Sequence, residues 1–247
     1  MAVRLAQVDD LLVFEVEHVA EGGEMRRGRL RDCWSVRFEG VAPVRRFVSK
    51  RGTPGFSGFR WTATTGGHVG YESWLERDHL TVLDFDPAIV GIASQPFWLH
   101  WHDGRRRRRH APDYFARRAD GAGVVVDVRA EDRIDPASAE AFEATARACE
   151  QVGWEFRRVG LLDPVFVANL RWLGGYRHPR CLRGDVAGRL AEVFAEPTPL
   201  FAGARTVGDR LGVLPSLFHL MWRQVLVADL RSAPLGPRTL VVAEGAR

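Results

Sequence analysis

Short runs of alternating apolar and polar residues predict strands in the first part of the chain. Residues 12–19 and 34–38 alternate with a period of two, which is typical of a strand with one buried face. The stretch at residues 50–67 is rich in Gly, Pro and Thr, and it is predicted to be a loop or linker. We therefore assign residues 1–58 to an N-terminal β portion.

The central part of the chain begins with a predicted helix at residues 71–84, because Leu75, Leu80 and Leu83 fall on one side of it. The helix is expected to end at the turn before Pro87, since the residue before a proline avoids the helical conformation. It is the first element of a longer series of helices and strands.

Three extended runs follow the helix, at residues 89–102, 105–118 and 124–129. Asp-Gly pairs at 103–104 and 120–121 predict tight turns between them. Strands joined by such short turns pair in the antiparallel sense, so the three runs predict an antiparallel meander.

A second helix and a fourth strand complete the central part. Asp135 as the N-cap, with Pro136 in the first helical position, predicts a helix that ends at Gly153. Residues 154–159 alternate in the manner of a strand. The order helix, three strands, helix, strand indicates an α/β domain, to which we assign residues 59–175.

The last part of the chain, residues 176–247, is predicted to be mainly helical. Residues 186–195 and 214–227 have helical patterns, and residues 206–211 predict a short helix between them. An alternating pair of strands is expected around residues 233–243. Helices followed by a two-stranded flap are typical of a winged helix, and an ordinary helical packing domain fits the same pattern.

The amino-acid composition excludes several classes of protein and leaves the predicted order of elements unchanged. The 247 residues are 46% hydrophobic and 27% charged, which excludes a disordered chain, a collagen-like repeat and a disulfide-stapled miniprotein. No apolar stretch reaches the roughly 18 to 20 residues of a membrane span, and Asp9 and Asp10 stand where a signal peptide needs apolar residues. Three cysteines without a CxxC pair favour reduced thiols. We therefore expect a cytoplasmic protein with no membrane partner.

Positive charge is concentrated near the end of the chain. The 35 lysines and arginines against 31 acidic residues give a net charge of +4, and Lys50 is the only lysine. Residues 171–247 hold 11 arginines and 6 acidic residues. Arginine binds phosphate oxygens through a planar, two-pronged geometry, so this excess indicates a polyanionic partner.

Acidic residues occupy distinctive positions in the central domain. Glu72 and Glu76 are four residues apart on the first predicted helix and share a face. Asp113 follows a proline within the second strand run, and Asp127 interrupts the apolar third run. A carboxylate there is costly unless it is paired, so Asp127 and Arg129, which point the same way, form either an ion pair or part of a metal site.

The order of these residues along the elements favours the metal site. An acid on the helix, Pro-Asp on the second strand and an acid two residues before a base on the third give the pattern of PD-(D/E)xK nucleases. Carboxylate oxygens suit Mg²⁺, with Mn²⁺ as a substitute. Such an ion activates water and neutralises charge on an attacked phosphate. The triplet alone occurs by chance in many chains, and its placement on this series of elements makes it informative.

The sequence resembles the TnsA-like endonuclease subunits of heteromeric, Tn-seven-type transposases, which belong to the PD-(D/E)xK superfamily, especially the actinobacterial ones. The resemblance covers roughly residues 45–240. The segments that carry it are YESWLERDHL, LDFDP, QPF, HAPDYF, VVVDVR, NLRWLGGYRHPR and LFHLMWRQ. It implies a restriction-endonuclease-like core with a C-terminal winged-helix-like domain.

The resemblance also implies a function. The chain would hydrolyse double-stranded DNA at the 5′ ends of a transposon, beside an integrase-type transposase that cuts and joins the 3′ ends and an AAA+ ATPase that regulates both. Glu76 would be the acid on the helix, Asp113 the central metal ligand and Asp127 the acid of the third strand. Glu72 ranks below Glu76, as a residue that supports the metal ligands.

Arg129 departs from the family pattern, which has a lysine at this position. Arginine cannot act as a base, because its pKa stays above about 12, yet it can stabilise developing negative charge. Two interpretations remain open: an active nuclease in which Arg129 stabilises the transition state, or an attenuated subunit kept for DNA binding or scaffolding. A restriction or repair nuclease with the same fold is a further alternative.

Other polar residues are candidates for contacts with DNA. Gln95 is expected to orient the site or contact DNA, or simply to satisfy a strand end. The arginine run beside the Pro-Asp motif is either a solvated hairpin or a backbone-binding segment. The candidate DNA-binding residues are Arg105, Arg106, Arg107, Arg108, Arg109, Arg177 and Arg180.

Overall fold

The computed structural model describes residues 13–47 and 56–245, which form a mixed α/β protein of two compact units. The first unit comprises the described residues up to Trp61, together with His68–Arg77 and Ala88–Leu161. The second comprises Thr62–Gly67, Asp78–Pro87 and the described residues from Leu162 onward. The division into three domains at 58 and 175 therefore differs from the structure in number and position.

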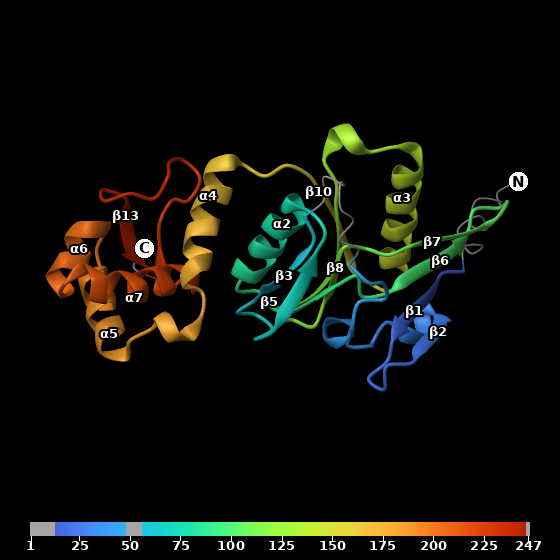
Figure 1. Cartoon of the computed structure of the whole chain (residues 1–247), viewed down its shortest axis with the longest axis horizontal. Helices are drawn as coiled ribbons and strands as arrows, with labels where there is room; N and C mark the ends of the chain where they lie inside the picture. The colour runs from blue at the N-terminus through green and yellow to red at the C-terminus, as the bar shows by residue number, and fades with distance from the viewer. Residues whose placement is uncertain (1–12, 48–55, 246–247) are drawn as a thin grey trace, which may run out of the picture. The chain divides into compact units, whose positions relative to one another are not determined.

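The central sheet of the first unit contains four strands in the order β10-β9-β8-β5. Its strands β5, β8 and β10 are labelled in Figure 1. β5 (Ile89–Ser94), β8 (Tyr114–Arg118) and β9 (Gly123–Val128) pair antiparallel, as the meander prediction requires. β10 (Glu155–Val159) lies parallel to β9, and the helix α3 (Pro136–Gln151) connects the two. A parallel pair needs such a crossover connection.

Two of the predicted strand runs are broken in the structure. The run at 89–102 is interrupted at Gln95, whose φ of 45° lies in the left-handed region and redirects the chain. The run at 105–118 is interrupted before Asp113 by Pro112, which lacks the N–H that a strand ladder needs. The tips of the two runs consequently leave the central sheet.

These tips form a second sheet with the N-terminal strands, in the order β2-β1-β6-β7. Its members are β1 (Glu15–Val19), β2 (Met25–Arg29), β6 (Trp98–His102) and β7 (Arg107–His110). All of the pairs are antiparallel. The N-terminal β portion is thus hydrogen-bonded to the central part of the chain.

Buried aromatic side chains explain why the N-terminal portion is not a separate domain. The predicted strand at 34–38 is wrong: the chain turns there and enters a short 3-10 helix, η2 (Phe38–Gly40). Phe38 is fully buried, and its ring lies edge-on to Phe97, Phe115 and Trp154, with centroids 5.0, 5.6 and 5.6 Å away. Phe38 therefore belongs to a core that the N-terminal portion shares with the central part of the chain.

The predicted linker is only partly a loop. Its residues 50–55, like the first residue of the predicted strand 12–19, lie outside the described residues. Within the remainder, β3 (Gly58–Trp61) pairs antiparallel with β4 (His68–Tyr71). α2 (Trp74–Phe85) follows, where the first helix was predicted.

The two predicted helix caps of the central part are present. Asp135 accepts a hydrogen bond from the backbone N–H of Ser138 at 2.7 Å, and Pro136 stands in the first turn of α3. After the helix, Gly153 has a φ of 69°, a left-handed conformation that glycine adopts without strain. Local sequence chemistry therefore sets both ends of this element.

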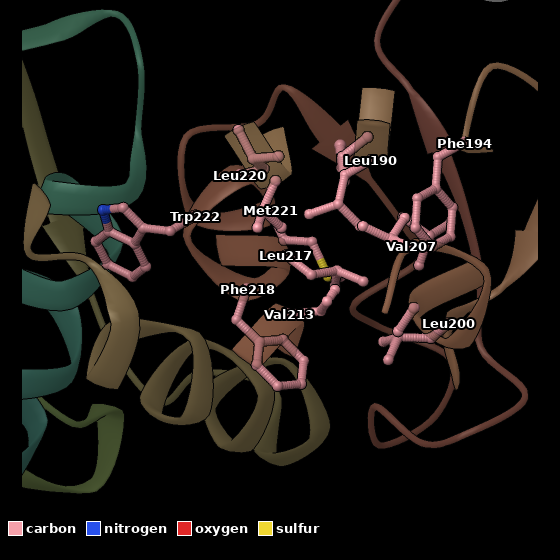
Figure 2. Close-up of a cluster of buried hydrophobic side chains, with 14 of the residues drawn as sticks. Leu190, Phe194, Leu200, Val207, Val213, Leu217, Phe218, Leu220, Met221 and Trp222 are labelled. Atoms are coloured by element: carbon pink, nitrogen blue, oxygen red, sulfur yellow. The ribbon is translucent and has the colours of Figure 1, made fainter. Parts of the chain in front are cut away.

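The second unit combines helices with a small sheet. The helices are α4 (Pro164–Leu173), α5 (Gly184–Val193), α6 (Leu200–Val207) and α7 (Arg210–Trp222). The strands β11 (Thr198–Pro199), β12 (Leu226–Val227) and β13 (Leu240–Ala243) form an antiparallel sheet in the order β11-β13-β12. Figure 2 shows the core, where Leu190 of α5, Leu200 of α6 and Leu217 of α7 are buried together.

Several predictions for this unit are corrected. The predicted helix 206–211 is absent from the described structure, because α6 ends at Val207 and Asp209 caps a new helix by accepting from the N–H groups of Leu211 and Gly212. The predicted helix 214–227 stops at Trp222, and its last two residues are β12.

The predicted strand pair at 233–243 is also wrong, since only residues 240–243 are extended and they pair with β12 and β11. Pro234 and Pro237, which lack N–H groups, stand in the irregular stretch before them. Among the described residues, none of the helices combines the length and the apolar character that a membrane crossing requires.

Candidate functional site

A cavity of about 590 Å³ in the first unit contains the three predicted metal ligands. Glu76, Asp113 and Asp127 all line it, and so does Arg129. The lining also includes residues outside the predicted set of site residues, among them Arg45, Trp98, His110, Ser138 and Phe142.

Strand pairing brings the two aspartates together. Asp113 directly precedes β8, and Asp127 lies in β9, which pairs with β8 in the register Tyr114↔Val126. The backbone N–H of Asp113 donates to Asp127 Oδ1 at 3.3 Å, and the N–H of Val128 donates to Asp113 Oδ2 at 2.7 Å. The antiparallel meander therefore places both carboxyl groups at the same edge of the sheet.

Glu76 comes from the first turn of α2 and takes part in the helix cap. Its Oε2 accepts from the N–H of Glu72 at 2.7 Å and its Oε1 accepts from the hydroxyl of Ser73 at 2.9 Å. The Ser73 hydroxyl in turn accepts from the N–H of Glu76 at 3.1 Å. This reciprocal arrangement is a variant of the capping box. It fixes the start of α2 and the position of the Glu76 backbone.

The three carboxyl groups influence one another electrostatically. Burial, followed by the negative charges of Asp127 and Glu76, raises the pKa of Asp113 well above its usual range. Burial likewise raises the pKa of Glu76, against the hydrogen bonds that Glu72 and Ser73 donate to it. Like charges held in a poorly solvated site favour proton uptake or a bound cation.

His110 holds Asp127, a contact that the sequence analysis did not anticipate. The His110 Nε2 atom lies 2.9 Å from Asp127 Oδ1 and 3.0 Å from Oδ2, and Asp127 is only 1% exposed. Arg129 is exposed and donates from Nη2 to Ser138 Oγ at 3.2 Å. In the described structure the partner of Asp127 is thus His110, in place of the Asp127–Arg129 ion pair left open from the sequence.

The three carboxylates are chemically suited to bind a metal ion. In this structure, however, their oxygens do not converge on one point as metal ligands do. Within the described ranges, no three His, Cys, Asp or Glu side chains are gathered closely enough to hold a metal ion. Glu76 directs its oxygens at the helix cap and Asp127 directs its oxygens at His110. The donors themselves are hard carboxylate oxygens of the kind that bind Mg²⁺.

Glu72 and Gln95 support the site in different ways. Glu72 binds the guanidinium of Arg45 through two hydrogen bonds, of 2.9 and 2.6 Å. Gln95 is 1% exposed, and its backbone N–H donates to the carbonyl of Asp113 at 2.9 Å, while its own carbonyl accepts from Val44. Its burial in this structure agrees with the orienting role and leaves no face for DNA.

The arginine run divides into residues with different surroundings. Arg108 donates to Asp103 at 2.7 Å and to Glu140 at 2.8 Å, so its charge is neutralised within the protein. The guanidinium of Arg109 lies 4.3 Å from the ring centre of Trp98 and lines the cavity. The other three members, Arg105, Arg106 and Arg107, are exposed on the hairpin.

The two candidate DNA-binding arginines of the second unit also differ. Arg177 has a side chain that is 16% exposed, bonds the carbonyl of Gly174, and lies 3.6 Å from Asp84, so burial lowers its pKa. The guanidinium of Arg177 is therefore mostly buried and engaged within the protein. Arg180, in the short 3-10 helix η5 (Pro179–Cys181), is exposed.

No family model matches this sequence, and no curated protein matches it either.

Proposed function

We propose that this protein is a metal-dependent DNA endonuclease, the subunit of a heteromeric transposase that hydrolyses a phosphodiester at the 5′ ends of the transposon and leaves a 5′ phosphate. The observation that carries the proposal is the common cavity of Glu76, Asp113 and Asp127 and the effect of their charges on Asp113. Acidic residues from a helix and two adjacent strands are the metal-binding groups expected of a Mg²⁺-dependent phosphodiesterase.

The order of the surrounding elements supports the same proposal. α2 is followed by the antiparallel strands β5, β8 and β9, then by α3 and the parallel strand β10. This is the order of a restriction-endonuclease-like core. The strands β6 and β7 extend two of these runs and bring the arginine hairpin to the edge of the unit that carries the cavity.

The residues of this chain have separate roles in the proposed reaction. Glu76, Asp113 and Asp127 would hold Mg²⁺ or Mn²⁺, and the chemistry such an ion supplies when bound is an activated water and neutralisation of phosphate charge. His110 fixes the Asp127 carboxylate, and Gln95 fixes the backbone of Asp113. Arginines around the cavity attract the DNA backbone.

We also propose that the second unit is a winged-helix-like module that recruits DNA and the partner subunits. Its order, α5, β11, α6, α7, β12, β13, is that of a winged helix. Residues 216–222 of α7, however, are all buried, whereas a helix that reads a major groove must expose its side chains. The exposed arginines Arg180, Arg205 and Arg223 are better placed to meet a polyanion than this part of α7. The partners in the proposal are an integrase-type transposase and an AAA+ ATPase.

The proposal is tested by nicking of supercoiled plasmid in Mg²⁺ or Mn²⁺, with the partner transposase present, for the native chain and for Asp113→Asn. Magnesium-dependent cleavage that the variant lacks would support it. Cleavage that survives in the variant would overturn it.

A catalytically attenuated subunit is the second candidate, and the engagement of Glu76 and Asp127 by protein donors favours it. Arg129→Lys separates the two, because it restores the lysine of the nuclease pattern. We expect no large gain in the cleavage rate, since Arg129 is exposed and bonded to Ser138. A large gain, measured in the same nicking assay, would instead identify the natural protein as attenuated.

Arg109 and Arg108 form a matched pair for testing DNA contact. Arg109→Ala is expected to weaken duplex binding and to lower the slope of log affinity against log salt by about one, because one phosphate contact is lost. Arg108→Ala is expected to leave the slope unchanged, since Asp103 and Glu140 already neutralise that charge. Fluorescence anisotropy of a labelled duplex across a salt series measures both slopes, and equal slopes would contradict the assignment of Arg109.

A further inference from the structure

Arg45 has the most direct connection to the acidic cluster among the arginines around the cavity. Its Nη1 and Nη2 atoms donate to Glu72 Oε1 and Oε2, at 2.9 and 2.6 Å. The backbone N–H of Glu72 in turn donates to the Glu76 carboxylate at 2.7 Å. Arg45 is thus one residue removed from a proposed metal ligand.

The other two cavity arginines are directed elsewhere. Arg129 is bonded to Ser138, and Arg109 is stacked on Trp98. Burial raises the pKa of both Glu76 and Asp113, and the positive charge of Arg45 opposes that rise in each case. The field of the Arg45 guanidinium therefore acts on two of the three acids.

The pairing with Glu72 leaves Arg45 available to a ligand. The Arg45 side chain is 35% exposed and lines the cavity, and that of Glu72 is 24% exposed. A carboxylate that accepts two hydrogen bonds from a guanidinium fixes the plane of the guanidinium. It does not occupy all five N–H donors of that group. The remaining donors are able to bind a second anion, and a planar guanidinium suits the oxygens of a phosphate.

We propose that Arg45, oriented by Glu72, binds the scissile phosphate and stabilises its negative charge during hydrolysis, the role that the sequence pattern gave to residue 129. This inference rests on the proposed nuclease function and names a further residue for it. Glu72 is then a positioning residue for Arg45. The N-terminal portion of the chain consequently supplies part of the site.

A set of charge-matched variants of the full chain tests this role. Arg45→Ala is expected to lower kcat for plasmid nicking about 100-fold in Mn²⁺, comparable to loss of one preorganised donor to a transition-state oxyanion, with a smaller change in KM. Arg45→Lys is expected to recover only part of the rate, because an ammonium lacks the planar fork. Arg46→Ala is the control: Arg46 is exposed, adjacent in sequence and outside the cavity lining.

The double variant Arg45→Ala/Glu72→Gln decides between phosphate binding and a merely structural ion pair. If Arg45 only neutralises Glu72, removing both charges restores most of the cleavage rate, and the inference is overturned. If Arg45 binds the phosphate, the double variant remains as slow as Arg45→Ala. Thermal denaturation of each variant shows whether it is folded, and the double variant avoids the unpaired Glu72 charge that would destabilise the single one.

A binding measurement without metal gives a readout other than cleavage. In the Asp113→Asn background, the chain is expected to prefer a nicked duplex with a 5′ phosphate over the same duplex without it, and Arg45→Ala is expected to abolish that preference. An unchanged preference would overturn the inference. If the native chain cleaves nothing, or if Asp113→Asn cleaves normally, the proposed function itself fails, which is a different result from recovery in the double variant.

Discussion

Asp113→Asn is expected to abolish metal-dependent DNA cleavage and, at the same time, to make the folded protein more stable at neutral pH. Asparagine keeps the shape of the side chain and most of its hydrogen bonding, but it cannot provide a charged oxygen ligand. Because Asp113 shares the cavity with Asp127 and Glu76, whose charges both act on it, its loss is expected to lower the cleavage rate at least ~1,000-fold, the scale of losing an essential member of a catalytic site.

The gain in stability follows from the sign of the pKa shift. Burial and the neighbouring carboxylates raise the pKa of Asp113 in the folded protein, whereas in the unfolded chain this carboxyl ionises near pH ~4. Above that pH the unfolded state releases the proton first, so the native protein loses stability as pH rises towards the folded pKa, and the full penalty remains above it. The neutral amide of the variant carries no such penalty.

The melting temperatures of the two proteins are therefore expected to agree near pH ~3 and to diverge as pH rises above about 4 towards the raised pKa of Asp113, with the variant higher. Mg²⁺ is expected to raise the melting temperature of the native chain and not that of the variant. Asp132→Asn, at an exposed site away from the cavity, is the matched control. A variant that is less stable than the native chain at every pH would show that Asp113 is a structural carboxylate.

The acidic site was predictable in outline because it depends on local patterns. The helix that carries Glu76 and the apolar strand that carries Asp127 are each marked by their own sequence. Two tight turns then make adjacent strands antiparallel, which brings Asp113 to Asp127 without any knowledge of distant contacts. The same reasoning explains the accurate prediction of α3, whose cap is Asp135.

The partners of these acids were not predictable, because each is selected by the fold. Arg45 reaches Glu72 across 27 residues, and nothing in its neighbourhood distinguishes it from Arg46. His110 was visible beside the Pro-Asp motif, but its pairing with Asp127 depends on the break in the strand before Asp113. That break is signalled only by Pro112.

Strand boundaries failed for a related physical reason. In the first long run, apolar residues on both sides of the break at Gln95 are buried, such as Ile92 and Phe97. Phe97 and Leu99 belong to one core together with Phe14 and Val16 of the N-terminal portion. A period-two pattern indicates that alternate side chains are buried, but it does not indicate which sheet they belong to.

Phe38→Ala is expected to lower the free energy of unfolding by about 3–5 kcal/mol, as for other large-to-small changes at fully buried aromatics. Phe38 is 0% exposed and meets the rings of Phe97, Phe115 and Trp154 from the central part of the chain. Removal of its ring leaves a cavity at the point where the N-terminal portion and the central sheet share one core.

For a protein of this length the loss corresponds to a fall in melting temperature of about 10 °C, measurable by circular dichroism or calorimetry on the full chain. Phe59→Ala is the control, because Phe59 is 61% exposed and its loss is expected to cost less than about 1 kcal/mol. If residues 1–58 formed a domain of their own, Phe38→Ala would lower only a separate early transition and leave the unfolding of the central sheet unchanged. A shift of the entire transition of the first unit is the result that the shared core requires, and it would explain how Arg45, from the same N-terminal portion, is held at the cavity.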